Sequence, residues 1–486
     1  MQSFDNTSVV PQGWSWKLGA LVAAIAVIVD ILLVQSPLIW LGAAGMVAVL
    51  AQFRSPLSGL AVVIFTCGLL NYSPFEMGAL SRLYPGDLAI GIFVFAWMLS
   101  NFSWPPRDMF PSTVLNRPFL GLALLTPLSM LWSRLYPDPE VTYAYPHSDV
   151  SWATAQASQI VLLAATMCIP FAVAAGIKRW KDVETIVIII GLVVAIGTLL
   201  TAGGLLFGFG GSYSILGATR AYWGQPWDSS MEPLTALCIP FLFSAVLFGR
   251  HSVSHYRLIC GLFAFSLAGL VLTFSRATWL LGFLGLLLVS ATWLRRRVNP
   301  TLALLIIVVL STGVVLSGVI GLISTFYNPS DVYGLERIYY YATALQLFVS
   351  HPLLGVGAGN YQFFDRLYEG QEAGGIAHNQ FLTVAAETGL TGLMMFLWLV
   401  VALLKIRKHL GFAVPHLADS HEWLTVAGSA FLLIWIGECL FQEAFFATAA
   451  AGGGMHVLTV IVFPWTFLGV LLAAWNLSQT APALES

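Results

Sequence analysis

IVIIIGLVVAIGTLLTAGGLL, residues 186–206, is a run of 21 residues without one charged side chain. A helix of that length rises about 30 Å, which is the thickness of the hydrocarbon core of a bilayer. The whole chain has the same character, since 58% of its 486 residues are hydrophobic, 9% are charged and the mean hydropathy is +0.83. Soluble domains carry about 25% charged residues, so the sequence indicates an integral membrane protein.

Apolar segments of this kind recur along the chain and predict a single all-α membrane domain over residues 1–486. We expect about 12–14 transmembrane helices, because several of the fourteen candidates are short. The five cysteines are isolated, which argues against a disulfide framework or a zinc site. The expected spans are 17–34, 38–52, 57–72, 88–100, 119–133, 152–175, 184–208, 233–248, 257–275, 277–294, 301–323, 379–404, 423–441 and 455–475.

The basic residues predict the orientation of the chain. With both termini in the cytoplasm, 15 of the 21 basic residues lie on the cytoplasmic side, as the positive-inside rule requires. All six that remain on the outer side are arginines, whose planar fork fits phosphate oxygens. For each of these arginines, the alternative to phosphate binding is that it lies at the interface and pairs with an outer carboxylate. These six are Arg82, Arg134, Arg220, Arg276, Arg337 and Arg366.

The longest hydrophilic interruption, 324–378, is expected on the outer side between the eleventh and twelfth spans. Apolar residues at 335, 338, 342, 345 and 349 predict an amphipathic helix on the outer membrane surface, with Arg337 near the lipid phosphates. The following GVGAGN, 355–360, looks like a nucleotide-binding loop. However, it follows no predicted strand, so we interpret it as a turn that returns the chain to the membrane.

GGIAHNQFLTVAAETGL, residues 374–390, leads from this loop into the next span. A neutral imidazole at His378 can accept a proton from an attacking hydroxyl near neutral pH. Helix capping is the alternative for His378, and Asn379 could also provide it. Glu387 does not share the helical face of His378. It instead forms a polar stripe with Gln380 and Thr383, which we expect to face the interior of the bundle.

Two further arginines are candidates for anion binding. Arg276 lies in LTFSRATWLLG between two apolar spans, where a charge is unfavourable unless it meets water or an anion. Snorkelling of its side chain to the interface is the alternative. Arg220 lies in the loop 209–232 among tyrosines and tryptophans, which are typical of interfacial belts and could also stack on sugars.

Three segments, SRATWLLGFLGLLL (275–288), ERIYYYATALQLFVSHPLLGVGAGNYQ (336–362) and AHNQFLTVAAETGLTGL (377–393), occur in this order. Together they resemble the signature of the O-antigen ligase and polymerase superfamily of GT-C-like membrane glycan transferases. The segment GQPWDSSMEPLTA (224–236) departs from the Pro-Asn-containing stretch usual in that superfamily. Arg220 sits where one of its arginines often precedes the central span.

The resemblance implies transfer of a glycan from an undecaprenyl-diphosphate donor to an acceptor hydroxyl at the periplasmic face of the bacterial inner membrane. It implies inversion without a covalent intermediate and without a cofactor; the matched region has no DxD-like carboxylate pair, so no metal is expected. The implied catalytic residues are His378, Arg276 and Arg337. Arg276, Arg337 and Arg220 would bind the donor diphosphate, with Asn379, Ser275 and Glu387 in supporting positions.

The acceptor stays open at this point. A ligase would transfer the glycan to lipid A-core or to a protein side chain, whereas an O-antigen or exopolysaccharide polymerase would join it to another lipid-linked repeat. A polysaccharide or lipid transporter or flippase is the alternative of another class, since many spans and few charges suit it too. Only Asp30, Glu387 and Glu438 are candidates for buried carboxylates, and no repeat is evident, which favours the enzyme. Membrane lipids are expected partners, and nucleic acid is not.

Overall fold

A computed structural model describes most of the apolar part of the chain. The remaining residues lie outside this description, among them the expected spans 17–34 and 38–52 and most of 301–323. The described residues are 55–69, 85–100, 112–139, 152–207, 211–215, 218–222, 231–273, 275–297, scattered positions between 301 and 312, 332–364, 377–412, 421–446 and 457–480.

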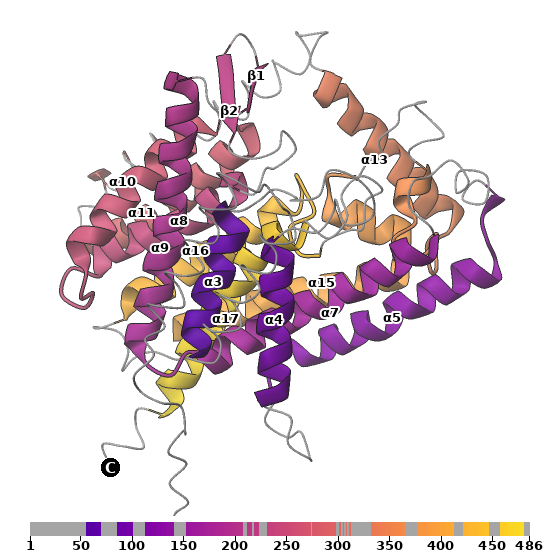
Figure 1. Cartoon of the computed structure of the whole chain (residues 1–486), viewed down its shortest axis with the longest axis horizontal. Coiled ribbons are helices and arrows are strands. Elements are labelled where there is room, and N and C mark those ends of the chain that lie inside the picture. Colours follow the sequence, from indigo (N-terminus) through magenta and orange to yellow (C-terminus); the bar gives the residue numbers. More distant parts are fainter. Residues whose placement is uncertain are drawn as a thin grey trace, which may run out of the picture.

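Helices dominate the described residues and confirm the predicted all-α class (Figure 1). Eleven of them fall on eleven of the fourteen expected spans, and the twelfth, α13, lies in the long loop. The helices are α3 (Pro56–Leu69), α4 (Pro85–Ser100), α5 (Asn116–Leu135), α7 (Trp152–Gly176), α8 (Trp180–Phe207), α9 (Met231–Phe248), α10 (Tyr256–Leu272), α11 (Arg276–Arg297), α13 (Val332–Ser350), α15 (Gln380–Phe412), α16 (Glu422–Glu438) and α17 (Val457–Thr480).

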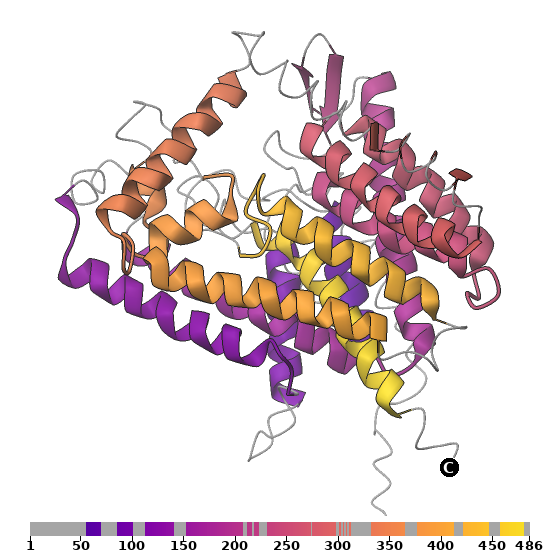
Figure 2. The ribbon, with the colours of Figure 1, turned by 180° about the vertical axis from the view of Figure 1, so that it is seen from behind.

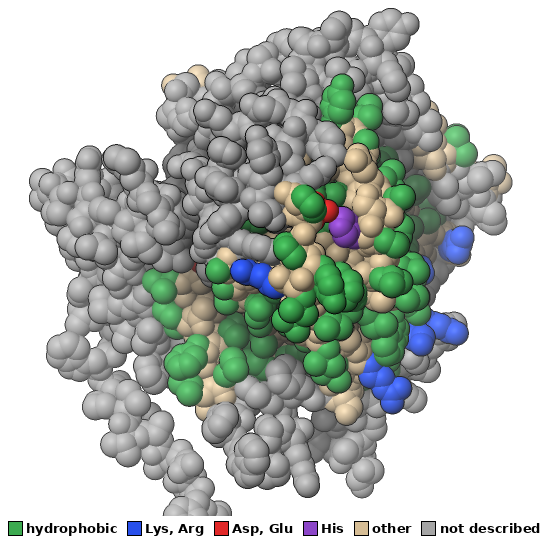
Figure 3. Space-filling view, turned by 90° about the vertical axis from the view of Figure 1, so that its right-hand side faces the viewer, with side chains coloured by type: hydrophobic (Ala, Val, Ile, Leu, Met, Phe, Trp, Pro, Cys, Tyr) green, Lys and Arg blue, Asp and Glu red, His purple; other side chains and the backbone are tan. Residues whose placement is uncertain are grey.

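Length and composition support a polytopic membrane protein. Six described helices, α5, α7, α8, α11, α15 and α17, are long and apolar enough to cross a membrane. Four shorter apolar helices, α3, α4, α9 and α10, accompany them. Figure 3 views the molecule from the side toward which α5 and α13 extend in Figure 1, and hydrophobic side chains cover most of its described surface. Such a surface suits contact with lipid.

One short hairpin departs from the purely helical prediction. Strands β1 (Gly211–Ile215) and β2 (Ala218–Tyr222) pair antiparallel in the loop after α8. Two residues, Leu216 and Gly217, separate them in the sequence, which is the length of the tightest hairpin connections. The loop 209–232 thus contains a local sheet that the search for apolar spans did not reveal.

The helices pack as pairs that are distant in sequence. α17 packs on α7, α16 on α9 and α10 on α8. On the other side, α5 and α15 run side by side in both ribbon views, and α13 rises from the end of this pair (Figures 1 and 2). α13 therefore lies against the beginning of α15, where the sequence places His378.

A buried aromatic cluster fixes the segment 439–446, which follows α16. The rings of Trp435 and Phe445 stack with centroids 4.2 Å apart, and Trp465 meets both edge-on. The two indole N–H groups donate to carbonyls of the same segment, Trp435 to Ala444 at 2.8 Å and Trp465 to Phe445 at 2.7 Å. A buried indole needs such a partner, so packing and hydrogen bonding place this segment together.

Gln380 joins this segment to the first turn of α15. Its Oε1 accepts hydrogen bonds from the backbone N–H groups of Phe445 and Phe446, at 3.1 and 3.0 Å. The backbone N–H of Gln380 donates to the carbonyl of Cys439 at 2.8 Å. All these groups are buried, so the amide side chain satisfies two donors that water does not reach.

Gln380→Leu should therefore destabilise the protein although it keeps the volume of the side chain. Two buried N–H groups would lose their acceptor, which costs about 2–6 kcal/mol in total. Thermal unfolding of the purified protein in detergent measures the effect, with the exposed Gln346→Leu as the control. Equal midpoints for the two variants would show that Gln380 does not hold the segment.

Candidate functional site

α13 has two unlike faces. Thr343, Ala344 and Leu347 are buried against the rest of the protein, whereas Ile338 and Val349 are 53% and 75% exposed. The exposed residues belong to the apolar stripe that the sequence indicates, so the stripe points away from the protein. An apolar stripe without a protein partner is what a helix at a membrane surface presents to lipid.

α15 is interrupted at Gly389. This residue has φ 65° and ψ −162°, values that are far from helical, although the helix continues on both sides. In a regular helix the N–H groups just after this point would donate to the carbonyls four residues before them. The break prevents two of these hydrogen bonds, so two carbonyls before it and two N–H groups after it lack their helical partners. Within a membrane protein such freed groups must find other protein partners.

The turn after α13 supplies all four partners. Before the break, the carbonyls of Ala386 and Glu387 accept from the N–H groups of Val356 and Gly357, at 3.0 and 2.9 Å. Beyond it, the N–H groups of residues 390 and 391 donate to the carbonyls of residues 352 and 353, at 2.7 and 3.4 Å. We call residues 352–357 the inserted loop, because their backbone completes the interrupted helix.

Two glycines make this close approach feasible. A Cβ atom on Gly355 would lie 2.3 Å from the backbone carbon of Glu387, and one on Gly389 would lie 2.4 Å from that of Leu353. Both residues also have positive φ, which side chains disfavour. The glycine pattern therefore serves contact between two backbones, which the interpretation of GVGAGN as a simple turn did not foresee.

The side chain of Glu387 ties down the residues that follow the inserted loop. It is buried and accepts hydrogen bonds from the backbone N–H groups of Gly359 and, at 3.3 Å, Tyr361. The hydroxyl of Tyr361 in turn donates to the carbonyl of Tyr340 in α13, at 2.8 Å. The polar stripe of Gln380, Thr383 and Glu387 is buried, as its spacing predicted, and Glu387 connects α15 to α13.

His378 lies immediately before α15 in an unusual backbone conformation. Its φ is 49°, and it is the one residue other than glycine with positive φ in the described part of the chain. Its neighbour Asn379 caps the helix, because Asn379 Oδ1 accepts from the N–H groups of Phe381 and Leu382, at 3.0 and 3.2 Å. Capping is thus performed by Asn379, and the imidazole of His378 is not needed for it.

The imidazole of His378 faces α13. Its ring centroid lies 5.9 Å from that of Tyr340, and the positive charge of Arg337 is near enough to act on it. Burial, and secondly the Arg337 guanidinium, lower the pKa of His378 to about 4. The ring is partly exposed at the surface, yet protein surrounds most of it. The imidazole is therefore neutral at physiological pH and can accept a proton.

Glu443 is a further ionisable group at this point and was not among the predicted site residues. Its carboxylate is buried and accepts a hydrogen bond from the hydroxyl of Thr383 at 2.8 Å. Burial raises the pKa of the Glu443 carboxyl above its ordinary value, and hydrogen bonds from Thr383 and from backbone N–H groups, and lastly Arg337, offset this effect only in part. Three segments distant in sequence thus bring Arg337, His378 and Glu443 together.

The sequence offered a weak signal for Glu443. It follows the span 423–441 by two residues, where a carboxylate is normal for a loop. Its burial becomes visible only when the 439–446 segment folds back under the start of α15.

For the other predicted residues, the structure gives the backbone positions of two arginines and the hydrogen bonds of one serine. Arg276 is the first residue of α11, and Arg220 lies in β2 opposite Tyr213; their side chains lie outside the description. The hydroxyl of Ser275 accepts from the N–H and the hydroxyl of Thr278, at 3.5 and 2.9 Å, so it caps α11. A shared site for all three arginines remains a prediction.

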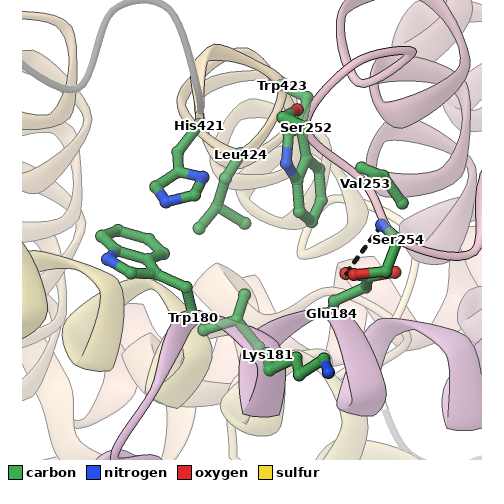
Figure 4. A pocket seen from close by; sticks show the side chains of 10 residues that line it. Trp180, Lys181, Glu184, Ser252, Val253, Ser254, His421, Trp423 and Leu424 are labelled. Carbon is green, nitrogen blue, oxygen red and sulfur yellow. Dashed lines mark hydrogen bonds between the residues drawn. The ribbon is translucent and has the colours of Figure 1, made fainter.

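A cavity of about 170 Å³ lies at the other end of α16 (Figure 4). The rings of Trp180 and His421 face each other on one side, with centroids 3.9 Å apart. On the other side Glu184 accepts hydrogen bonds from the N–H and hydroxyl of Ser254. α16 has 17 residues and spans roughly 25 Å, so this cavity is separate from the site at His378.

The described features define a polytopic helical membrane protein with a charged site at one end of its bundle. Within this chain, residues 261–397 match the family model described as O-Antigen ligase. The match runs from α10 through the inserted loop to the first part of α15, and it confirms the resemblance to the O-antigen ligase superfamily. Glu443 and the hairpin lie outside it. No curated protein matches the chain.

Gly355→Ala and Gly389→Ala should each lower the stability of the protein by about 3 kcal/mol or more, since each combines a backbone clash with positive φ. Gly261→Ala in α10 is the matched control, because a Cβ there meets no atom within 4 Å. Alanine should be neutral or stabilising at Gly261, by up to about 1 kcal/mol. Thermal unfolding in detergent compares the three, and unchanged midpoints at 355 and 389 would contradict the inserted loop.

Proposed function

We propose that this chain is a membrane glycan transferase of the O-antigen ligase type. It moves a glycan from undecaprenyl diphosphate to an acceptor hydroxyl at the periplasmic face of the bacterial inner membrane. The observation that carries the proposal is the position of His378 at the start of α15, inside the family match, with its ring centroid 5.9 Å from that of Tyr340 on the helix that carries Arg337.

The reaction needs a group that accepts a proton. The acceptor hydroxyl attacks the anomeric carbon of the glycan, and its oxygen forms the new glycosidic bond. Its proton passes to the imidazole of His378, which is neutral and therefore has a free nitrogen lone pair. A positioned base typically contributes about 10²–10⁴-fold to the rate, and most when its pKa lies near the working pH.

The reaction also needs a cation for the leaving group. As the bond between the anomeric carbon and the donor oxygen breaks, the departing diphosphate gains negative charge. Arg337 can bind that charge through two N–H groups at once, and among the described residues no salt bridge within 4.0 Å involves its guanidinium. Arg276 and Arg220 are proposed to assist, since the family resemblance implies that role.

The helix α13 places this chemistry at the membrane surface. Its exposed apolar stripe would lie in the outer leaflet, with Arg337 one residue from the exposed Ile338. A lipid-linked diphosphate lies at that depth, so the donor would reach Arg337 without leaving the bilayer.

His378→Ala and Arg337→Ala should each reduce glycan transfer by about 10² or more in reconstituted protein with a purified undecaprenyl-diphosphate-linked glycan. Arg276→Ala should behave in the same way. Arg257→Ala, exposed at the opposite end of the bundle, is the control. If one of the three site variants keeps full activity, the residue changed in it has no part in the mechanism. Wild-type protein without transfer activity would overturn the proposed function.

The products in a deletion strain distinguish ligase from polymerase. A missing ligase leaves long polymer on undecaprenol, whereas a missing polymerase leaves single repeats. We expect long polymer, because the family match is to O-antigen ligase. Accumulated single repeats would assign the chain to polymerisation instead.

The pKa of His378 provides an independent test. Nitrogen chemical shifts of ¹⁵N-labelled histidine, assigned by loss of the signal in His378→Gln, should show a midpoint near 4. Arg337→Ala should raise this midpoint, since a neighbouring cation disfavours the protonated ring, but burial should keep it below the ordinary value of about 6.5. A titration midpoint near 6.5 that is the same in the wild-type protein and in Arg337→Ala would contradict the described site.

A further inference from the structure

Glu443 is a buried carboxylate whose position general packing does not explain. One of its oxygens, Oε2, is buried and has no hydrogen-bond partner among the described residues. Burying a carboxylate in this way is unfavourable unless a charge or hydrogen bonds compensate. Ionisable groups buried in membrane proteins are therefore first candidates for function.

The contacts of Glu443 connect it to the two residues that set the position of His378. Oε1 accepts from the hydroxyl of Thr383 at 2.8 Å, and the backbone N–H of Asn379 also donates to the carboxylate. Asn379 is the helix cap that directly follows His378. The carboxylate thus lies under the turn that presents the imidazole.

Arg337 is the cation near this carboxylate in the described part of the chain. It favours the ionised form of Glu443 and disfavours the protonated form of His378. No salt bridge within 4.0 Å joins Arg337 to Glu443, so the attraction acts across a gap and leaves the guanidinium accessible to another anion.

Glu438 shows that burial alone does not create this arrangement. It lies five residues earlier, is also buried and also has an oxygen without a partner among the described residues. Its other oxygen accepts a hydrogen bond from the side-chain amide of Gln442, four residues further along the chain. The electrostatic contacts of Arg337 include Glu443 and do not include Glu438.

We propose that Glu443 is a positioning residue, the buried counter-charge that holds the guanidinium of Arg337 beside His378 until the donor diphosphate takes it over. The inference rests on the proposed function and deepens it. Glu443 keeps Arg337 oriented toward the reaction centre, and it competes with diphosphate for the same cation.

This double role predicts two effects of opposite sign for Glu443→Gln. The amide keeps an oxygen for Thr383 but loses the charge. Without its counter-charge Arg337 is less well oriented, so kcat for transfer should fall about tenfold. The same cation, released from a competing anion, should bind inorganic diphosphate several-fold more tightly in calorimetry.

Glu438→Gln is the matched control, because it replaces another buried carboxyl, at the end of α16, that is not among the groups that interact with Arg337. It should leave both kcat and diphosphate affinity near the wild-type values. Glu443→Asp keeps the charge on a shorter side chain and should recover more of kcat than Glu443→Gln.

The outcomes separate the two proposals. If Glu443→Gln and Glu438→Gln have the same kcat and the same affinity for diphosphate, the proposed role of Glu443 is wrong. It is also wrong if Glu443→Gln lowers kcat and weakens diphosphate binding together. The second result would indicate damage to the structure only. Wild-type protein that transfers no glycan would instead refute the proposed function, while calorimetry with inorganic diphosphate would still test Glu443 against Arg337.

Discussion

The exchange of backbone hydrogen bonds between the inserted loop and the interrupted helix α15 is the constraint on which the site depends. Four backbone groups that the break at Gly389 would leave unpaired are satisfied by residues 352–357. Each unpaired buried group would cost about 1–3 kcal/mol, which outweighs the roughly 1 kcal/mol that glycine adds in conformational entropy. Because the inserted loop directly follows α13, this exchange also fixes where α13 ends against α15. Backbone contacts therefore help to set how α13 packs against α15.

A second set of contacts completes the site from the other end of the chain. The aromatic cluster around Trp435 and Trp465 holds residues 439–446, and Gln380 ties them to the first turn of α15. This brings Glu443 beneath the turn of His378. The result is a cation, a neutral imidazole and a carboxylate contributed by three separate segments. Such a group fits a reaction in which a hydroxyl loses a proton while a diphosphate leaves with increasing negative charge.

The sequence predicts much of this architecture because hydropathy and helical spacing are local signals. Eleven expected spans coincide with described helices, and the amphipathic α13 and the buried stripe of Gln380, Thr383 and Glu387 follow from periodicity. Non-local backbone pairing leaves no such signal. The glycines at 355 and 389 therefore looked like features of a turn and a motif, and the hairpin β1–β2 was not expected. Glu443 was missed for the same reason, since only the fold of the 439–446 segment distinguishes a buried carboxylate from one in an ordinary loop.

The position of the bound donor tests the central claim most directly. A cryo-electron microscopy map of the protein with a non-hydrolysable undecaprenyl-diphosphate glycan analogue would show it. We predict density for the diphosphate within hydrogen-bonding distance of Arg337, with the anomeric carbon beside His378 and the lipid chain along the exposed face of α13. Diphosphate density elsewhere, for example in the cavity between Trp180 and Glu184, would contradict the assignment of the site.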